Sequence, residues 1–304
     1  MWRDTLSSLL CFVLVLGAAT SHAAPVFETW TAESASDKAP ELGLQDEVPV
    51  WWDVTGDGVA DPLFLSGFHI NRLHLDDTGA LTATMVEHPG IDLEPVSVLA
   101  PIDLDGDGVD ELLTIGRTAR MFRVTDVNEV REAVVPLPPF RALGANDIAV
   151  GDLNRDGLPD LYVAIGVAYS ERLNLQGRSD TILMNRGGGR FEAIPASPTR
   201  VGRTNGVTLV DMDGDGWLDV VESVDTSWVS GPSRLLYNRT QPGDTHPTLV
   251  ASEERWDTGT DGMGAAVADI DGDGHLDIYN TSIGHDLLAM GLGDGRFEDA
   301  THDK

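Results

Sequence analysis

Five copies of one nine-residue acidic segment recur along the chain, and each copy leads directly into a short run of strand-forming residues. The copies begin at Asp53, Asp103, Asp152, Asp211 and Asp269, so that successive starts lie 50, 49, 59 and 58 residues apart. Repeats of this kind are typical of folds in which similar units stack side by side. The even spacing therefore favours one quasi-symmetric domain over several unrelated ones.

Within each copy, positions 1, 3, 5 and 9 carry oxygen-bearing side chains, position 2 is apolar and position 6 is glycine. Calcium is bound in proteins by about six to eight oxygen atoms, and glycine allows the sharp backbone turn that such a site needs. Asp and Gly also form ordinary turns, but turn formation gives no reason for an acid at position 9 in every copy. The shared pattern therefore predicts that these loops bind a divalent metal ion.

An EF-hand begins with the same pattern, but it needs a glutamate at position 12 and a helix on each side. Only the fourth copy has glutamate at that position, as Glu222. The flanking segments are short runs rich in β-branched residues, such as VTLVDM before the fourth copy and VVES after it. Such runs indicate strands. Each loop is therefore predicted to connect the two strands of a β-hairpin.

Further strand candidates follow the hairpin in each unit, and the sequence GRFE occurs at both 189–192 and 295–298. Four antiparallel strands per unit are typical of a β-propeller blade, and radial stacking of blades hides most sheet edges. The sequence therefore predicts an all-β fold of five units at about 48–95, 96–143, 144–202, 203–260 and 261–304.

The motif DxDxDGxxD, placed between the first two strands of each unit, resembles the FG-GAP or VCBS repeat of integrin-α-type β-propellers. The GRFE turn is similar to the blade ends of bacterial VCBS-repeat proteins. The resemblance covers about residues 48–304 and implies a β-propeller of four-stranded antiparallel blades. Propellers of this family commonly have seven blades. Either five blades close into a ring, with Val26–Trp30 as the latching strand, or the five units are part of a seven-bladed propeller.

In that family the loop binds calcium through the side chains at positions 1, 3, 5 and 9 and the carbonyl at position 7. The resemblance thus implies up to five Ca²⁺ ions. The implied ligands of the first three loops are Asp53, Thr55, Asp57, Val59 and Asp61; Asp103, Asp105, Asp107, Val109 and Glu111; and Asp152, Asn154, Asp156, Leu158 and Asp160. Those of the last two are Asp211, Asp213, Asp215, Trp217 and Asp219; and Asp269, Asp271, Asp273, His275 and Asp277.

Three of these positions depart from the family pattern. Thr55 gives the first loop one charge fewer, so this loop is expected to bind most weakly, followed by the loop that contains Asn154. In the second loop Glu111 is longer than the usual aspartate, and the adjacent Asp110 competes with it.

The N-terminus has the pattern of a signal peptide at residues 1–23. Arg3 precedes an apolar stretch from Leu9 to Ala19, which is too short to span a bilayer, and small residues stand before a cleavage site at Ala23. An N-terminal segment at 24–47 would then precede the propeller. The sequence therefore predicts secretion to the extracellular space or the periplasm, with no membrane span in the mature chain. Because the single cysteine, Cys11, lies in the leader, the mature chain has no disulfide.

The formal net charge of −30 argues against nucleic acid as a partner, because nucleic acids are bound by clustered Lys and Arg. The motifs GxSxG, HExxH and GxxxxGK[ST] are absent from the sequence, and so is a mature cysteine nucleophile. The first hypothesis is therefore not an enzyme but a secreted calcium-binding β-propeller that acts as a protein- or glycan-interaction module, with structural calcium. The alternatives are an exported polysaccharide-acting enzyme, either a lyase or a hydrolase, on a propeller scaffold, and a piece of a larger adhesin.

Two features could mark recognition, and one histidine pair could mark a metal site. An insertion at Val167–Arg178 lengthens the third unit, and long loops on rigid scaffolds often bind partners. Trp217, Trp228 and Trp256 gather in the fourth unit, where they serve either as a sugar-stacking surface or as blade packing. His69 and His74 either share a metal or are separate surface residues on opposite faces of a strand.

Overall fold

The computed structural model describes residues 50–66, 69–75, 81–87, 98–103, 108–115, 119–133, 145–166, 179–196, 203–225, 231–257, 259–293 and 295–301. Several sequence predictions lie outside these ranges. They concern the signal peptide at 1–23, the N-terminal segment at 24–47, the latching strand at Val26–Trp30, the insertion at Val167–Arg178, and the residues Asp105, Asp107 and Trp228.

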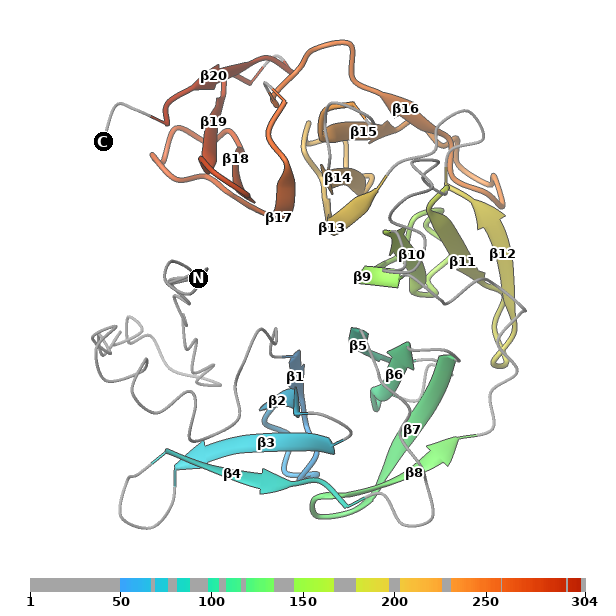
Figure 1. The fold of residues 1–304 in the computed structure, drawn as a ribbon. Helices are drawn as coiled ribbons and strands as arrows, with labels where there is room; N and C mark the ends of the chain where they lie inside the picture. The colour runs from blue at the N-terminus through green and yellow to red at the C-terminus, as the bar shows by residue number, and fades with distance from the viewer. Residues whose placement is uncertain are drawn as a thin grey trace, which may run out of the picture. The chain divides into compact units, whose positions relative to one another are not determined.

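Every secondary-structure element in the described residues is a β-strand, and the strands form five four-stranded antiparallel sheets (Figure 1). The first sheet consists of β1 (Val50–Trp52), β2 (Asp61–Ser66), β3 (His69–Leu75) and β4 (Leu81–Met85). The second consists of β5 (Val98–Ile102), β6 (Glu111–Ile115), β7 (Ala119–Asp126) and β8 (Glu129–Ala133). The third consists of β9 (Ala145–Gly151), β10 (Asp160–Ile165), β11 (Thr181–Asn185) and β12 (Phe191–Pro195).

The fourth sheet consists of β13 (Thr204–Val210), β14 (Asp219–Val224), β15 (Arg234–Asn238) and β16 (Leu249–Ala251). The fifth consists of β17 (Gly262–Ala268), β18 (Asp277–Ser282), β19 (Leu287–Gly291) and β20 (Phe297–Asp299). Within every sheet the spatial order of the strands follows the chain. The prediction of an all-β chain with five four-stranded antiparallel units is therefore confirmed.

Each acidic loop connects the first two strands of its sheet, as the sequence predicted. The residue before position 1 pairs with the residue at position 9 in all five sheets. The pairs are Trp52 with Asp61, Ile102 with Glu111, Gly151 with Asp160, Val210 with Asp219, and Ala268 with Asp277. The five hairpins therefore close in one register, which gives the loop acids equivalent places at the end of each sheet.

The chain divides into two compact units, of which the first contains sheet β1–β4 together with Val124–Val130. Glu87 and Glu129 form a parallel bridge in this unit, and the N–H of Asn128 donates to the carbonyl of Val54 at 3.1 Å. The buried apolar side chains here include Trp52, Leu63, Phe64 and Ile70.

The second unit contains Leu93–Arg123 and Arg131–Lys304. In it the first strands of successive sheets lie in contact, β5 with β9, β9 with β13, and β13 with β17. The central strands are buried on both faces, because Leu161 of β10 belongs to the core shared with the preceding sheet, whereas Tyr162 belongs to the core shared with the following one. Propeller blades stack in this way.

Small residues are needed where the first strands meet. A Cβ atom added to Gly206 on β13 would lie 2.8 Å from the Cα of Gly264 on β17. Separately, the described residues contain no helix that is long and apolar enough to cross a membrane.

Candidate functional site

The carboxylate at position 1 organises each acidic loop. In all five loops it accepts a hydrogen bond of 2.7 to 3.0 Å from the backbone N–H of the glycine at position 6. That glycine has a φ of 84° to 89° in every copy, a left-handed backbone conformation that residues other than glycine rarely adopt. The invariant Asp and Gly are therefore explained by the shape of the loop itself, before any ion is considered.

The hydrogen bonds at position 1 also favour the charged carboxylate. Partial burial tends to raise the pKa of Asp53, but hydrogen bonds from the N–H groups of Gly58, Gly56 and Asp57 outweigh it. The pKa of Asp53 is consequently held below its ordinary value. This carboxylate is anionic at neutral pH, as a metal ligand must be.

The acid at position 9 ties the loop to the third strand of its sheet. In loops three, four and five, its Oδ2 accepts the N–H of position 2 at 3.0, 2.9 and 2.8 Å. Its Oδ1 accepts an N–H from the end of the third strand at 2.8, 2.7 and 2.8 Å. The three pairs at this strand end are Asp160 with Asn185, Asp219 with Asn238, and Asp277 with Gly291. Position 9 therefore has a structural role whether or not it also binds an ion.

Two of these position 9 carboxylates, those of Asp160 and Asp219, have a pKa above the ordinary value of an aspartate. Burial raises the pKa of Asp160 to about 7 and that of Asp219 to about 6, although backbone N–H groups act in the opposite direction. The charges of Asp156 and Asp152 add to the effect at Asp160, and those of Asp213 and Asp215 add to it at Asp219. A divalent cation in the loop would favour the charged form of the acid.

In the first two loops the position 9 acid pairs with an arginine. Asp61 lies 3.2 Å from Arg72, and the buried Glu111 lies 2.6 Å from Arg123. Burial and the charge of Asp103 both raise the pKa of Asp110, although a hydrogen bond from the backbone of Asp103 acts in the opposite direction. The sequence had identified Asp110 as a competitor of Glu111.

Positions 1, 3 and 5 converge in the last two loops. One carboxylate oxygen from each of Asp211, Asp213 and Asp215 lies within 4.8 Å of the others, and the equivalent residues of the fifth loop are grouped in the same way. The fifth-loop group consists of Asp269, Asp271 and Asp273. The position 9 acids Asp219 and Asp277 are not members of these two groups. In the first and third loops Thr55 and Asn154 replace the carboxylate at position 3.

The donor set fits a hard divalent cation. Carboxylate oxygens are the ligands that calcium prefers, and the Oδ1 atom of Asp211 is buried without a hydrogen-bond partner among the described residues. An oxygen in that state needs a cation or a water molecule. At position 7, the N–H of Val59, Leu158, Trp217 and His275 donates to the position 5 carboxylate of the same loop. These hydrogen bonds use the N–H of position 7 and do not involve its carbonyl oxygen.

In the fourth loop, two of the acids already pair with an arginine side chain. Arg239 donates to Asp213 at 2.6 Å and to Asp215 at 2.9 Å, and its guanidinium carbon lies 4.6 Å from the centroid of the Tyr237 ring. Among the described residues no arginine or lysine pairs with the acids of the fifth loop. Sequence reasoning missed Arg239, whose only signal was its place directly after the third strand of the fourth unit.

The third loop packs closely against the fourth sheet. Asn154 is buried and its Nδ2 donates to the carbonyl of Thr245 at 3.2 Å. Arg155 has a positive φ of 57°, and its guanidinium lies 4.3 Å from the centroid of the Trp217 ring. Position 3 of this loop is therefore partly engaged in contacts between sheets.

The profile of the FG-GAP-like repeat matches residues 167–222. That range includes the fourth acidic loop and the strands β11, β12 and β13. The chain carries an FG-GAP-like repeat.

One solved structure supports the fold of this FG-GAP-repeat chain. A lectin of Agrocybe aegerita that specifically recognises non-reducing terminal N-acetylglucosamine is 16% identical, with a TM-score of 0.51 over 83% of this chain. The chain spans 65% of the lectin's length. At such identity the similarity concerns the fold alone.

Two further structures are more distant. The biofilm matrix protein Bap1 of V. cholerae is 15% identical, with a TM-score of 0.36 over 83% of this chain and 38% of that protein. The Malassezia sympodialis allergen Mala s 1 is 10% identical, with a TM-score of 0.45 over 86% of this chain and 83% of the allergen. No curated protein matched the sequence.

The FG-GAP-repeat chain uses two of its predicted recognition tryptophans for packing. Trp217 is 9% exposed and Trp256 is 3% exposed, so neither offers a free ring face for a sugar. On β3, the Nε2 atom of His74 lies 2.8 Å from the hydroxyl of Thr84. No metal-type group that contains His69 or His74 occurs in the described part of the chain. Blade packing is therefore the better interpretation of Trp217 and Trp256.

Proposed function

We propose that this chain is a secreted calcium-binding β-propeller that serves as an interaction module for an extracellular protein or glycan. The observation that carries the proposal is the grouping of three carboxylates at positions 1, 3 and 5 of the fourth and fifth loops. The partnerless Oδ1 atom of Asp211 supports it further. Calcium would supply a divalent positive charge between acids that otherwise repel one another.

The role of calcium in this proposal is structural. Position 1 shapes the loop, positions 3 and 5 complete the acidic group, and position 9 fixes the loop to the third strand. An ion at ten times its dissociation constant adds about 1.4 kcal/mol to the free energy of unfolding. Five such sites would add about 7 kcal/mol, compared with a total of about 5 to 15 kcal/mol for a typical domain.

Closure of the blades into a ring and export through a signal peptide at 1–23 belong to the same proposal. The contacts of β5 with β9, β9 with β13, and β13 with β17 support radial stacking in the second unit. The absence of disulfides in the mature sequence fits a domain that relies on calcium for stability outside the cell.

Three points support an interaction role and narrow the class of partner. The sequence has none of the catalytic motifs considered, the net charge of −30 disfavours polyanionic partners, and the fold is similar to that of a lectin. The partner would thus be a protein or a neutral glycan rather than a nucleic acid.

The test combines thermal unfolding with ligand capture on the mature chain. We expect the melting temperature to fall by more than about 4 °C when calcium is removed by a chelator, and to recover when calcium is restored, because even one to two kcal/mol produces such shifts. Capture on immobilised neutral glycans and on secreted proteins, with and without calcium, then identifies the partner class. A melting temperature that does not respond to chelation contradicts the calcium part of the proposal, and release of cleaved glycan contradicts the non-enzymatic part.

A further inference from the structure

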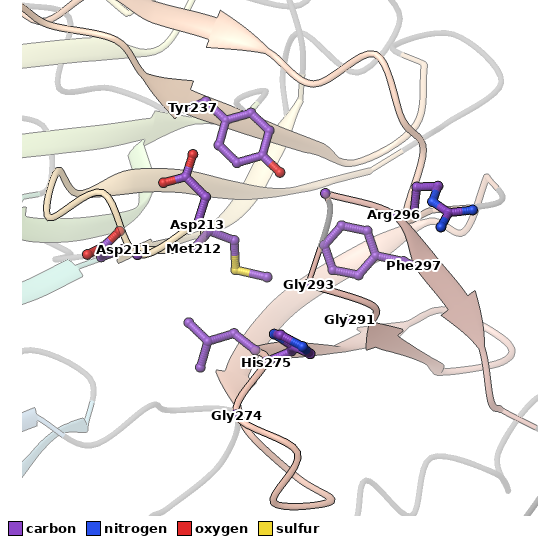
Figure 2. A pocket seen from close by; sticks show the side chains of 13 residues that line it. Asp211, Met212, Asp213, Tyr237, Gly274, His275, Gly291, Gly293, Arg296 and Phe297 are labelled. Atoms are coloured by element: carbon purple, nitrogen blue, oxygen red, sulfur yellow. The ribbon is translucent and has the colours of Figure 1, made fainter.

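A cavity of about 190 Å³ lies between sheet β13–β16 and sheet β17–β20 (Figure 2). One wall comes from the start of the fourth loop and from Tyr237 on β15, and the other comes from His275 in the fifth loop and from the hairpin between β19 and β20. Both sheets belong to the second compact unit.

Three side chains that make contacts at the preceding junction between sheets are replaced by smaller residues here. Between the third and fourth sheets, Arg155 at position 4 covers Trp217 at position 7, and the Nδ2 atom of Asn238 donates to the carbonyl of Leu153 at 2.8 Å. The equivalent residues at the next junction are Gly214, His275 and Gly291. Asn238 and Gly291 are equivalent because each donates its N–H to the position 9 acid of its own unit.

Glycine also lets the hairpin between β19 and β20 approach the fifth loop. A side chain on Gly291 would collide with the carbonyl of Leu276, and one on Gly293 would collide with the His275 ring. A Cβ on Gly295 would lie 3.1 Å from the hydroxyl of Tyr237. The backbone of this hairpin is therefore part of the cavity wall.

The lining combines aromatic rings with polar groups of both signs. The rings of Tyr237, Phe297 and His275 face the same space in Figure 2, where Asp213 lies on one side and Arg296 lies at the opposite edge. The His275 side chain is exposed, and among the described residues its ring has no hydrogen-bond partner. The cavity thus offers stacking surfaces, an imidazole and both donors and acceptors.

We infer that this cavity binds one ring of a neutral saccharide. The inference rests on the proposed interaction function. It narrows the partner to a glycan and the binding site to this cavity. Hydroxyl groups both donate and accept, so they suit a wall that carries the phenol of Tyr237, the imidazole of His275 and the guanidinium of Arg296. The C–H face of the ring packs on Tyr237 and Phe297.

Charge and size favour a small neutral ligand. The overall charge of −30 disfavours an anionic ligand, and the guanidinium of Arg296 disfavours a cationic one. The volume of about 190 Å³ is smaller than the roughly 300 to 1,000 Å³ of pockets for drug-sized ligands. One terminal sugar ring is a ligand of suitable size.

The test is a titration of the calcium-loaded mature chain with single neutral sugars, followed by protein NMR. The probes are N-acetylglucosamine, glucose, galactose, mannose and fucose, with glucuronate as the acidic comparison. We compare the wild type with His275→Trp, which fills the cavity as Trp217 fills the preceding junction, and with Arg296→Ala. Position 7 offers only its carbonyl as a calcium ligand in the proposed site, so His275→Trp leaves that ligand in place.

Matched controls exist in the same chain. Arg190→Ala removes the equivalent arginine of the other GRFE turn, and His246→Ala removes an exposed histidine that does not line the cavity. We expect at least one neutral sugar to bind, its affinity to fall about three- to tenfold in Arg296→Ala, and binding to be lost in His275→Trp. Both controls should bind as the wild type does.

Each alternative outcome is decisive. If no neutral sugar binds, or if glucuronate binds better, the cavity is not a neutral saccharide site. The proposed calcium-dependent function is tested separately, by the chelation experiment. If a sugar binds equally to wild type, His275→Trp and Arg296→Ala, the glycan role survives but this location is wrong. Melting curves show whether each variant is folded, and if one is not, Tyr237→Phe takes its place.

Discussion

The guanidinium of Arg239 donates a hydrogen bond of 2.6 Å to the carboxylate of Asp213, which is position 3 of the fourth acidic loop. The same group reaches Asp215 at 2.9 Å. Two acids that the sequence assigns to a metal ion are thus already paired with a positive charge of the chain. This feature distinguishes the fourth loop from the fifth, although the two sequences follow the same motif.

Replacing Arg239 should strengthen cation binding at the fourth loop. Arg239→Ala removes a competing positive charge, and exposed ion pairs of this kind are worth about 0.2 to 1 kcal/mol, so we expect the calcium affinity of this loop to rise about two- to fivefold. Calorimetric titration of the variant measures the change. Arg186→Ala is the matched control, because Arg186 follows β11 as Arg239 follows β15 but pairs with Glu192. An equal effect of the two substitutions would contradict this account.

Position 9 and position 5 of the fourth loop should have separable effects. Asp219 is buried and accepts two backbone N–H groups, so Asp219→Asn should lower the free energy of unfolding by about 1 to 3 kcal/mol even with calcium chelated. Asp215 is exposed, so Asp215→Asn should weaken calcium binding and leave the stability of the calcium-free protein within about 0.5 kcal/mol of wild type. Urea denaturation in chelator measures both values. The same loss in both variants would show that position 9 has no special structural role.

The close approach of β13 and β17 predicts a difference between two glycines. Gly206→Ala would place a Cβ atom 2.8 Å from the Cα of Gly264, so it should cost about 1 to 3 kcal/mol of stability through overpacking. A Cβ on Gly264 would meet only the hydroxyl of Thr281, at 3.7 Å, so Gly264→Ala should be nearly neutral. Denaturant midpoints of the two variants give the comparison, and equal midpoints would argue against tight packing of these strands.

A buried acid between the third and fourth sheets should make stability depend on pH. Burial, followed by the charge of Glu222, raises the pKa of Asp180 to about 8. Because the pKa in the folded state exceeds that in the unfolded state, the folded protein retains a proton that the unfolded chain releases. The contribution of this group is therefore complete below about pH 4 and is lost as the pH rises toward about 8.

Asp180→Asn removes this titration and keeps an oxygen for the N–H of Ile165, which donates to Oδ1 at 2.7 Å. Between about pH 5 and pH 8, the free energy of unfolding of the wild type should fall more steeply than that of the variant, by up to about 1 kcal/mol per pH unit. Unfolding curves at constant calcium across this range measure the difference. Parallel pH profiles would contradict the assignment.

The sequence predicted the sheets well because one motif repeats in one register. Each loop joins a strand to its neighbour, and the pairing of Val210 with Asp219 has its equivalent in all five sheets. Local chemistry is sufficient for this, since position 1 and the position 6 glycine form the turn within a few residues of each other.

Contacts between units were not accessible to the same reasoning. The burial of Trp217 under Arg155, the pairing of Arg239 with Asp213, and the cavity beside His275 all depend on which residues stand at equivalent positions of neighbouring sheets. A single motif read along the chain does not reveal such pairs. Alignment of the five units against one another would have flagged the change from Asn238 to Gly291.

Calcium uptake is the most direct test of the central claim, and calorimetric titration of Ca²⁺ into the chelator-treated mature chain measures it. We predict saturable binding with at least two sites, corresponding to the groups around Asp213 and Asp271, and the loss of one site in Asp271→Asn. A titration that shows no calcium uptake by the folded protein would contradict the account.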